Sequence, residues 1–222
     1  MNVFAIGPDR ECEELEVRYE SVKCLESTED LKGKYSEGDA LIYFWENESI
    51  DDLQVVLGMK DLTVILNSVN STLAEISVFI EGIQCNLLGF AGISGFIDKD
   101  AWEISELNNN DFLKAKSLFE LLNVRAVKVA DRVGLASPRV ICMIINEAFY
   151  TVMEGTAEKS DIDTAMKLGT NYPGGPFEWL EKIGIITVYE LLEAIYEDTK
   201  DERYKICPLL KQEYLIELGV RS

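Results

Sequence analysis

Short apolar runs alternate with polar segments over the first 130 residues. Between these runs lie segments with helical spacing or helix-capping signals. Continuous apolar runs are typical of strands buried on both faces, and strands that alternate with helices predict a mostly parallel sheet. The predicted strands are residues 2–6, 39–45, 62–66, 87–93, 101–107 and 124–129, and the predicted helices are 49–57, a segment after the Thr72/Glu75 capping box, and 110–122. Residues 16–26 show a strand-like alternation, and 27–38 predict a polar loop with one helical turn.

The remaining chain predicts a series of helices. Ser137-Pro138 combines a capping hydroxyl with a proline at the first helical position, and apolar residues then recur at helical spacing as far as Gly155, a C-cap signal. Further helix starts are expected at Ser160, after the turn 174–176, and at Thr187 with Glu190, and Gly169 should end the second helix. We therefore expect an α/β domain over residues 1–130 and an all-helical domain over 131–222.

Composition narrows the possible functions. The chain has 222 residues, 47% of them hydrophobic, with a formal net charge of −19 and no histidine. This acidity argues against nucleic acid and anionic membrane surfaces as partners, and the absence of histidine removes the commonest general base and metal ligand. No apolar run is long enough to span a bilayer, and the amino terminus lacks a basic region before its apolar run. Five scattered cysteines without a CxxC pair suggest neither a disulfide framework nor a zinc site, so we expect a cytoplasmic protein with reduced thiols and no metal.

Several motifs in the second half carry a resemblance to a known family. They are Asp131-x-x-Gly134, Asn146-Glu147-Ala148, Asp161-Ile162-Asp163 and Pro173-x-Gly175-Pro176-Phe177. In order and spacing they resemble the C-terminal helical domain of the 3-hydroxyacyl-CoA dehydrogenase family. Residues 39–47, 66–68 and 88–90 are similar to strand ends of its nucleotide-binding half, where the first forty residues replace about twice that length. The resemblance implies a truncated Rossmann-like, mostly parallel sheet followed by an all-helical dimerisation domain, and hence a homodimer.

The resemblance also implies a chemistry. The family passes hydride from a 3-hydroxyacyl-CoA to NAD, with a histidine as base, a glutamate that orients it, and a serine and an asparagine that hold the substrate oxygen. In this chain Ala91 stands at the histidine position and Pro138 at the asparagine position, whereas Glu103 matches the glutamate. The serine position falls near Val69, which leaves Ser68 or Ser71 as its occupant.

Cofactor and substrate contacts follow from the same alignment. Glu46 and Asn67 match positions beside the nicotinamide. Arg139, Asn146 and Phe177, with Ser68, are the candidates for a substrate pocket, while the motifs that hold Asn146 and Phe177 also suit a role in helix packing and turns alone. A dinucleotide-binding turn needs G-x-G-x-x-G so that backbone amides approach the diphosphate. Here a single glycine at position 7 is followed by Pro8, which has no amide hydrogen, and by acidic residues, so NAD binding is not expected.

Three hypotheses follow. The first is a family member that lacks efficient catalysis and binds an acyl-CoA or a competent partner subunit. The second is an active NAD-dependent dehydrogenase in which Glu103 or Tyr43 replaces the base, since loss of a general base costs on the order of 10²–10⁴ in rate and leaves slow turnover. The third is a purely structural module whose pockets have closed.

Overall fold

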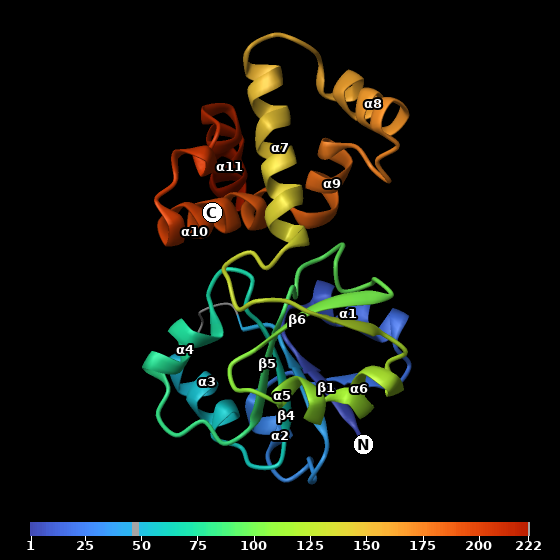
Figure 1. Cartoon of the computed structure of the whole chain (residues 1–222), viewed down its shortest axis with the longest axis vertical. Helices are drawn as coiled ribbons and strands as arrows, with labels where there is room; N and C mark the ends of the chain where they lie inside the picture. The colour runs from blue at the N-terminus through green and yellow to red at the C-terminus, as the bar shows by residue number, and fades with distance from the viewer. Residues whose placement is uncertain (46–48, 222) are drawn as a thin grey trace. The chain divides into compact units, whose positions relative to one another are not determined.

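Two compact units make up the chain, Met1–Leu135 and Ala136–Ser222 (Figure 1). The computed structural model describes the backbone of residues 1–45 and 49–221, and side chains in these ranges as far as residue 219. Within the described residues, none of the helices is long and apolar enough to cross a membrane.

The first unit is built on a seven-stranded sheet. Its spatial order is β2-β1-β3-β4-β5-β6-β7, and every neighbouring pair is parallel except β5 and β6, which are antiparallel. The strands are β1 (Val3–Ile6), β2 (Val22–Cys24), β3 (Ala40–Tyr43), β4 (Thr63–Asn67), β5 (Asn86–Phe90), β6 (Ala101–Glu106) and β7 (Arg125–Lys128). The expected α/β class with a mostly parallel sheet is therefore confirmed.

Helices cover both faces of this sheet, as Figure 1 shows. They are α1 (Asp9–Arg18), α2 (Thr28–Leu31), α3 (Ile50–Leu57), α4 (Leu73–Phe79), α5 (Asp111–Lys114) and α6 (Lys116–Leu121). Side chains alternate across a strand, so Val3 and Ala5 of β1 enter the core under α1 and α6, whereas Phe4 and Ile6 enter the core under α2, α3 and α4. The sheet is therefore buried on both sides, which explains the continuous apolar runs in the sequence.

The strand order identifies what the first unit lacks. A doubly wound dinucleotide-binding sheet has the order 3-2-1-4-5-6. Strands β2-β1-β3-β4-β5 correspond to 2-1-4-5-6 of that order, so the outermost strand 3 has no counterpart among the described residues. The Rossmann-like sheet is therefore truncated at one edge, and β2 becomes the edge strand.

Two sequence predictions for the first unit hold only in part. The strand-like segment 16–26 contains the strand β2, but its residues 16–18 belong to the end of α1. The expected helix 110–122 is divided into α5 and α6 at Ala115. The predicted Thr72/Glu75 capping box is confirmed, and Ser49 caps α3 by accepting from the Asp52 amide.

A buried carboxylate ties the amino terminus to the sheet. Asp39 lies just before β3 and is 2% exposed. Its Oδ1 accepts from the Asn2 amide at 2.6 Å, and its Oδ2 accepts from the Asn2 side chain at 3.1 Å and the Ser36 amide at 3.0 Å. Burial alone would raise the pKa of Asp39, but these hydrogen bonds outweigh it and hold the pKa below its ordinary value.

The second unit is all-helical, as expected. Its elements are α7 (Ser137–Met153), α8 (Lys159–Thr170), α9 (Pro176–Ile183), α10 (Ile185–Thr199), the 3₁₀ turn η1 (Glu202–Tyr204) and α11 (Pro208–Arg221). Helix α7 lies between α10 and α11 on one side and α8 and α9 on the other (Figure 1). Its buried stripe, which includes Ile141, Ile145 and Phe149, and the buried stripe of α10 supply most of the core.

Helix boundaries in this unit follow the expected signals only in part. Gly155 has the predicted left-handed conformation, with φ of 71°, just after α7, and Pro176 opens α9. Ser160 is not the N-cap of α8, which begins at Lys159, and α8 continues past Gly169 to Thr170. Thr187 does not open α10 either, because that helix begins at Ile185.

Candidate functional site

The turn between β1 and α1 is where a dinucleotide-binding sheet holds a diphosphate. In this chain Gly7 lies under the Phe44 side chain, and a Cβ on Gly7 would come within 2.4 Å of Phe44 Cβ. Pro8 is the N-cap of α1 and supplies no amide hydrogen, and the first helical turn carries Asp9 and Glu11. The aromatic ring therefore occupies the space above the turn, and the helix terminus presents negative charge.

A cavity of ≈ 380 Å³ adjoins this turn at the carboxyl ends of β1 and β3. Its described lining includes Pro8, Trp45, Glu26, Glu29 and Asp52, and no lysine or arginine. Diphosphates are bound by amide hydrogens of the glycine turn and by cationic side chains; here Pro8 supplies no amide hydrogen at the turn, and the described lining contains no cation. The residues present do not fit the diphosphate of NAD.

The residues matched to the family's catalytic and nicotinamide positions lie around β4, β5 and β6. Ala91 follows β5 and is 6% exposed, so a buried methyl group occupies the place of the base. Asn67 ends β4, and its Oδ1 accepts from the Gly92 amide at 3.0 Å, which holds the two strand ends together. Glu103 is half-buried in β6, in register with Val127 of β7. Glu46 lies outside the described residues.

Ser68, the candidate substrate-binding serine, belongs to a small polar cluster. Its side chain is 1% exposed, and its Oγ has no hydrogen-bond partner in the part of the chain that the structure describes. A Cβ on Gly89 would lie 2.3 Å from Ser68 Oγ and 2.5 Å from Ser105 Oγ, so the two hydroxyls flank this glycine from β4 and β6. Ser71 is half-buried at the turn before α4.

Asp131 completes this cluster, and sequence reasoning assigned it no role. Its carboxylate accepts from the amides of Leu73 at 2.9 Å and Ala74 at 3.0 Å. Asp131 therefore caps α4, although it is separated from these two residues by 58 and 57 positions in the sequence. The Ser105 hydroxyl lies 3.5 Å from the same carboxylate. The Asp131-x-x-Gly134 motif marks Asp131 in the sequence. It does not indicate that Asp131 caps α4, because a cap supplied by so distant a residue leaves no local pattern.

Three further candidates lie in the helical unit. Arg139 Nη1 donates to the Tyr204 hydroxyl at 3.0 Å, and its guanidinium lies over the Tyr204 ring. Asn146 is 3% exposed; its Nδ2 donates to the Lys205 carbonyl at 3.0 Å and its Oδ1 accepts from the Cys207 amide at 2.8 Å. The amide of Asn146 therefore fastens the segment before α11 to α7.

Phe177 and its neighbours form a packed corner of the helical unit. The Phe177 ring meets the Phe149 ring edge-on at 5.3 Å, and the Lys159 ammonium lies over both rings. The Phe177 amide donates to Asp163 Oδ1 at 2.8 Å, and the Glu178 amide donates to Asp163 Oδ2 at 3.2 Å. Asp163 therefore caps α9 from within α8. Pro138 lies in the first turn of α7 and offers no amide donor.

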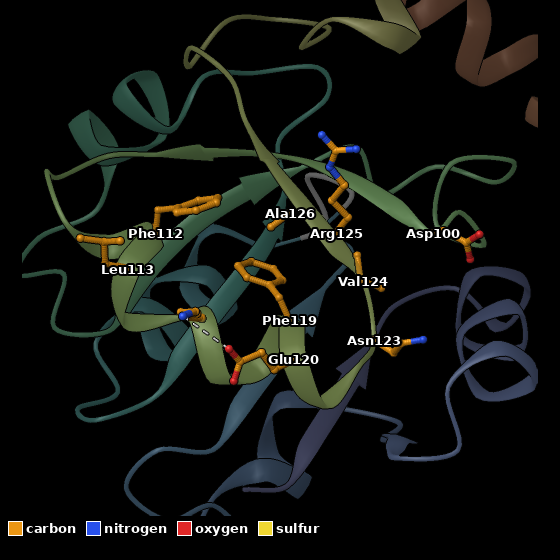
Figure 2. A pocket seen from close by; sticks show the side chains of 10 residues that line it. Asp100, Phe112, Leu113, Phe119, Glu120, Asn123, Val124, Arg125 and Ala126 are labelled. Carbon is orange, nitrogen blue, oxygen red and sulfur yellow. Dashed lines mark ion pairs between the residues drawn. The ribbon is translucent and has the colours of Figure 1, made fainter.

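A separate groove of ≈ 950 Å³ lies beside β7 and helices α5 and α6 (Figure 2). The rings of Phe112 and Phe119, with centroids 5.9 Å apart, form its apolar part, and Lys116 pairs with Glu120 at 3.6 Å at the rim. None of the residues matched to the family's chemistry lines this groove.

Solved structures define the class of this architecture. The chain superposes on the crystal structure of FadB2 from M. tuberculosis with a TM-score of 0.76 at 16% identity, over 98% of this chain and 94% of that one. For (S)-3-hydroxybutyryl-CoA dehydrogenase PaaH1 from Ralstonia eutropha the TM-score is 0.72 at 18% identity, with the same coverage. At such identities the likeness concerns the fold, which is that of two-domain dehydrogenases with a Rossmann-like sheet and a helical C-terminal region.

The sequence of the helical unit identifies the family. Residues 134–219 match the model of the 3-hydroxyacyl-CoA dehydrogenase C-terminal domain. The chain is 43% identical over 96 residues to 3-hydroxyadipyl-CoA dehydrogenase of Escherichia coli, a match that spans 43% of this chain and 20% of that protein. It is 40% identical over 100 residues to a probable 3-hydroxybutyryl-CoA dehydrogenase of Bacillus subtilis, over 45% of this chain and 35% of that protein. Residues 134–219 therefore belong to the family of 3-hydroxyacyl-CoA dehydrogenase C-terminal domains.

The match covers more of the chain in a mitochondrial relative. Hydroxyacyl-coenzyme A dehydrogenase of Sus scrofa is 30% identical over 130 residues, which cover 55% of this chain and 41% of that protein. In each of these three relatives the chain spans less than half of the relative's length.

Proposed function

We propose that the protein is a 3-hydroxyacyl-CoA dehydrogenase homologue that binds acyl-CoA, or a competent partner subunit, without efficient dehydrogenase chemistry. The observation that carries the proposal is the β1–α1 turn, where the Phe44 ring covers Gly7 and Pro8 caps an acidic helix terminus. A dinucleotide diphosphate there would meet an apolar ring and carboxylates in place of amide hydrogens. NAD binding is therefore lost at its most demanding contact.

The position of the base supports the same proposal. The buried Ala91 cannot accept the proton that leaves the hydroxyl as hydride is transferred, and the whole sequence contains no histidine. Pro138 likewise replaces a side-chain amide donor to the developing alkoxide. Glu103 is retained without the group that it would orient.

Two measurements test this function. The first follows NADH oxidation with acetoacetyl-CoA, in parallel with an active family member as positive control. We expect no turnover above the protein-free rate, and NADH-dependent reduction by the purified chain would refute the proposal. If turnover is seen, Glu103→Gln and Tyr43→Phe then identify which side chain has replaced the base.

The second measurement is thermal unfolding with acyl-CoA, free CoA or NAD. A ligand at one hundred times its dissociation constant adds about 2.7 kcal/mol to the stability of the folded state. We expect stabilisation by acetoacetyl-CoA and none by millimolar NAD. If neither ligand stabilises the protein, acyl-CoA binding is refuted and binding to a partner subunit is the remaining function. The absence of any complex with a co-expressed active family member would then refute this second function too.

We also propose a homodimer formed through the helical unit. Among the described residues, α8 buries none of its side chains, and Leu168 on this helix is 83% exposed. On α11, Leu215 and Ile216 are 54% and 58% exposed. Apolar side chains in this number are typical of association surfaces. Sedimentation should give a dimer mass, and Leu168→Glu should shift the protein toward monomer, whereas Val17→Glu, at the similarly exposed Val17 of α1, should not.

A role with acyl-CoA also suits a cytoplasmic protein. All five cysteines are free thiols in the structure. Free thiols persist in reducing compartments. Fractionation of cells that express the tagged protein would test this location.

A further inference from the structure

Two of the five cysteines lie against each other beside the β1–α1 turn. Cys12 is in the first half of α1 and is 7% exposed, and Cys24 ends β2 and is half-buried. The Cys24 thiol donates to the backbone carbonyl of Cys12 at 3.4 Å. The Cys12 thiol in turn lies 3.7 Å from the Gly7 carbonyl.

The surroundings hold this pair in place. Helix α1 packs along β2, and Cys24 packs against the apolar core cluster that contains Cys12. The Cys24 amide donates to Glu16 Oε1 at 2.9 Å, so the end of β2 is also fastened to α1 by a side chain. The Cys24 thiol is therefore held against the backbone of Cys12, and this closeness is the first requirement for a disulfide between two cysteines.

The two thiols differ in reactivity from the other cysteines. The hydrogen bond from Cys24 lowers the pKa of Cys12, although burial and the carboxylates of Asp9, Glu11 and Glu16 oppose the shift. The same hydrogen bond raises the pKa of Cys24. Burial raises the pKa of Cys85 and of Cys142 to about 12 each. Because the thiolate is the nucleophile in thiol oxidation, Cys12 is the sulfur suited to react first.

We propose that Cys12 and Cys24 form a dithiol that hydroperoxides oxidise to a disulfide. The Cys12 thiolate attacks the terminal peroxide oxygen; an S–O bond forms, the O–O bond breaks, and hydroxide or an alkoxide leaves and takes up a proton. The Cys24 sulfur then displaces the hydroxyl group from the Cys12 sulfenic acid, and water leaves as the S–S bond forms. The two thiols lose two electrons and two protons, and the peroxide is reduced to two molecules of water, or to an alcohol and water.

This modification would act on the acidic cavity described above. Pro8 and Glu26 line that cavity and flank the pair along the chain, because Pro8 precedes α1 and Glu26 follows β2. A Cys12–Cys24 bond fixes the start of α1 to the end of β2. The oxidised protein should therefore hold the cavity rim more rigidly than the reduced protein.

Peptide mapping of the oxidised protein tests the proposal directly. Trypsin cuts after Arg10, Arg18, Lys23 and Lys32, so Cys12 and Cys24 fall in different peptides, residues 11–18 and 24–32. After treatment of the folded protein with hydrogen peroxide and blocking of the remaining thiols, we expect these peptides as one linked species, lighter than their sum by two hydrogen atoms. Dithiothreitol should separate them again. Unlinked peptides, or Cys12 found only as a sulfinic or sulfonic acid, would overturn the proposal.

Matched variants separate a specific pair from general oxidation. Cys24→Ser should abolish the link and leave Cys12 as a sulfenic acid that dimedone traps, whereas Cys85→Ser should leave the link unchanged. In the wild type, Cys12 and Cys24 should lose their free thiols at least about tenfold faster than Cys85 and Cys142, because reaction follows the thiolate fraction and Cys24 lies next to Cys12 to close the disulfide. Equal rates at all four positions would contradict the mechanism. The readout is the mass of the linked peptides, so its outcome does not depend on whether the protein binds acyl-CoA.

Discussion

Removing the Asn146 side-chain amide should loosen the helical unit at one identifiable place. In Asn146→Ala, the Cys207 amide and the Lys205 carbonyl both lose their partner. The Cys207 hydrogen bond is fully buried, whereas the Lys205 residue is exposed and its carbonyl can turn to water. A buried polar group left without a partner costs about 1–3 kcal/mol, and the second bond adds about 1 kcal/mol, so we expect a loss of about 2–4 kcal/mol.

Alkylation of the Cys207 thiol measures this loss locally. Cys207 is 0% exposed, so its thiol reacts only when the segment before α11 opens. If opening is rapid compared with alkylation, the reaction rate follows the population of the open form. A loss of about 2–4 kcal/mol then accelerates alkylation roughly 30- to 900-fold. Gln212→Ala, which removes an exposed amide from α11, is the control and should stay within about 0.5 kcal/mol of the wild type.

The opposite outcome would refute the structural role of Asn146. If Asn146→Ala alkylates at the wild-type rate but no longer binds acetoacetyl-CoA, the amide serves the ligand pocket that the family resemblance implied. If the variant opens faster and still binds the ligand, Asn146 is a structural clamp.

Three further predictions concern other polar contacts. Asp163→Ala should cost about 1–2 kcal/mol in urea unfolding because it removes the cap of α9, whereas Asp161→Ala, an exposed carboxylate two positions away, should cost little. Burial raises the pKa of Asp39 and the hydrogen bonds that it accepts lower it, with a net shift downward. The Asp39 carboxylate therefore contributes to folding stability above a pH of about 4, and this contribution is lost as the pH falls through the pKa of the folded state. In Asp39→Asn, the melting temperature should consequently fall less steeply as the pH is lowered. Gly89→Ala should cost about 1–3 kcal/mol because its Cβ meets two buried hydroxyls, and a second change, Ser68→Ala, should recover part of that loss; full wild-type stability of Gly89→Ala would contradict the packing.

The buried strands were predictable because each carries its own signal. Residues 39–45 and 62–66 are apolar without interruption, and both lie at the centre of the sheet. Helix α1 was missed because it gives a weak signal: only Cys12 and Leu15 are buried, and Val17 near its end is 88% exposed. A glutamate-rich segment with two core residues has no clear period, so its helical state depends on packing against β1 and β2.

The candidate site was less predictable for a different reason. The sequence shows that Asn146 and Asp163 belong to family-like motifs, but not which groups they bind. In the structure both side chains bind backbone amides of later segments, 61 positions away for Asn146 and 14 for Asp163. Contacts at such separations depend on how the helices pack, and no local spacing encodes them.

Loss of the outermost Rossmann strand exposes a backbone edge that could recruit other chains. β2 now ends the sheet on one side and β7 on the other. Exposed strand edges invite aggregation, and short strands with lysine or arginine resist it. β2 has only three residues, with Lys23 exposed at its centre, and β7 has four, with Arg125 and Lys128 exposed at its ends. Within a chain of net charge −19, exposed cations therefore lie on both edge strands, where a misplaced strand would dock.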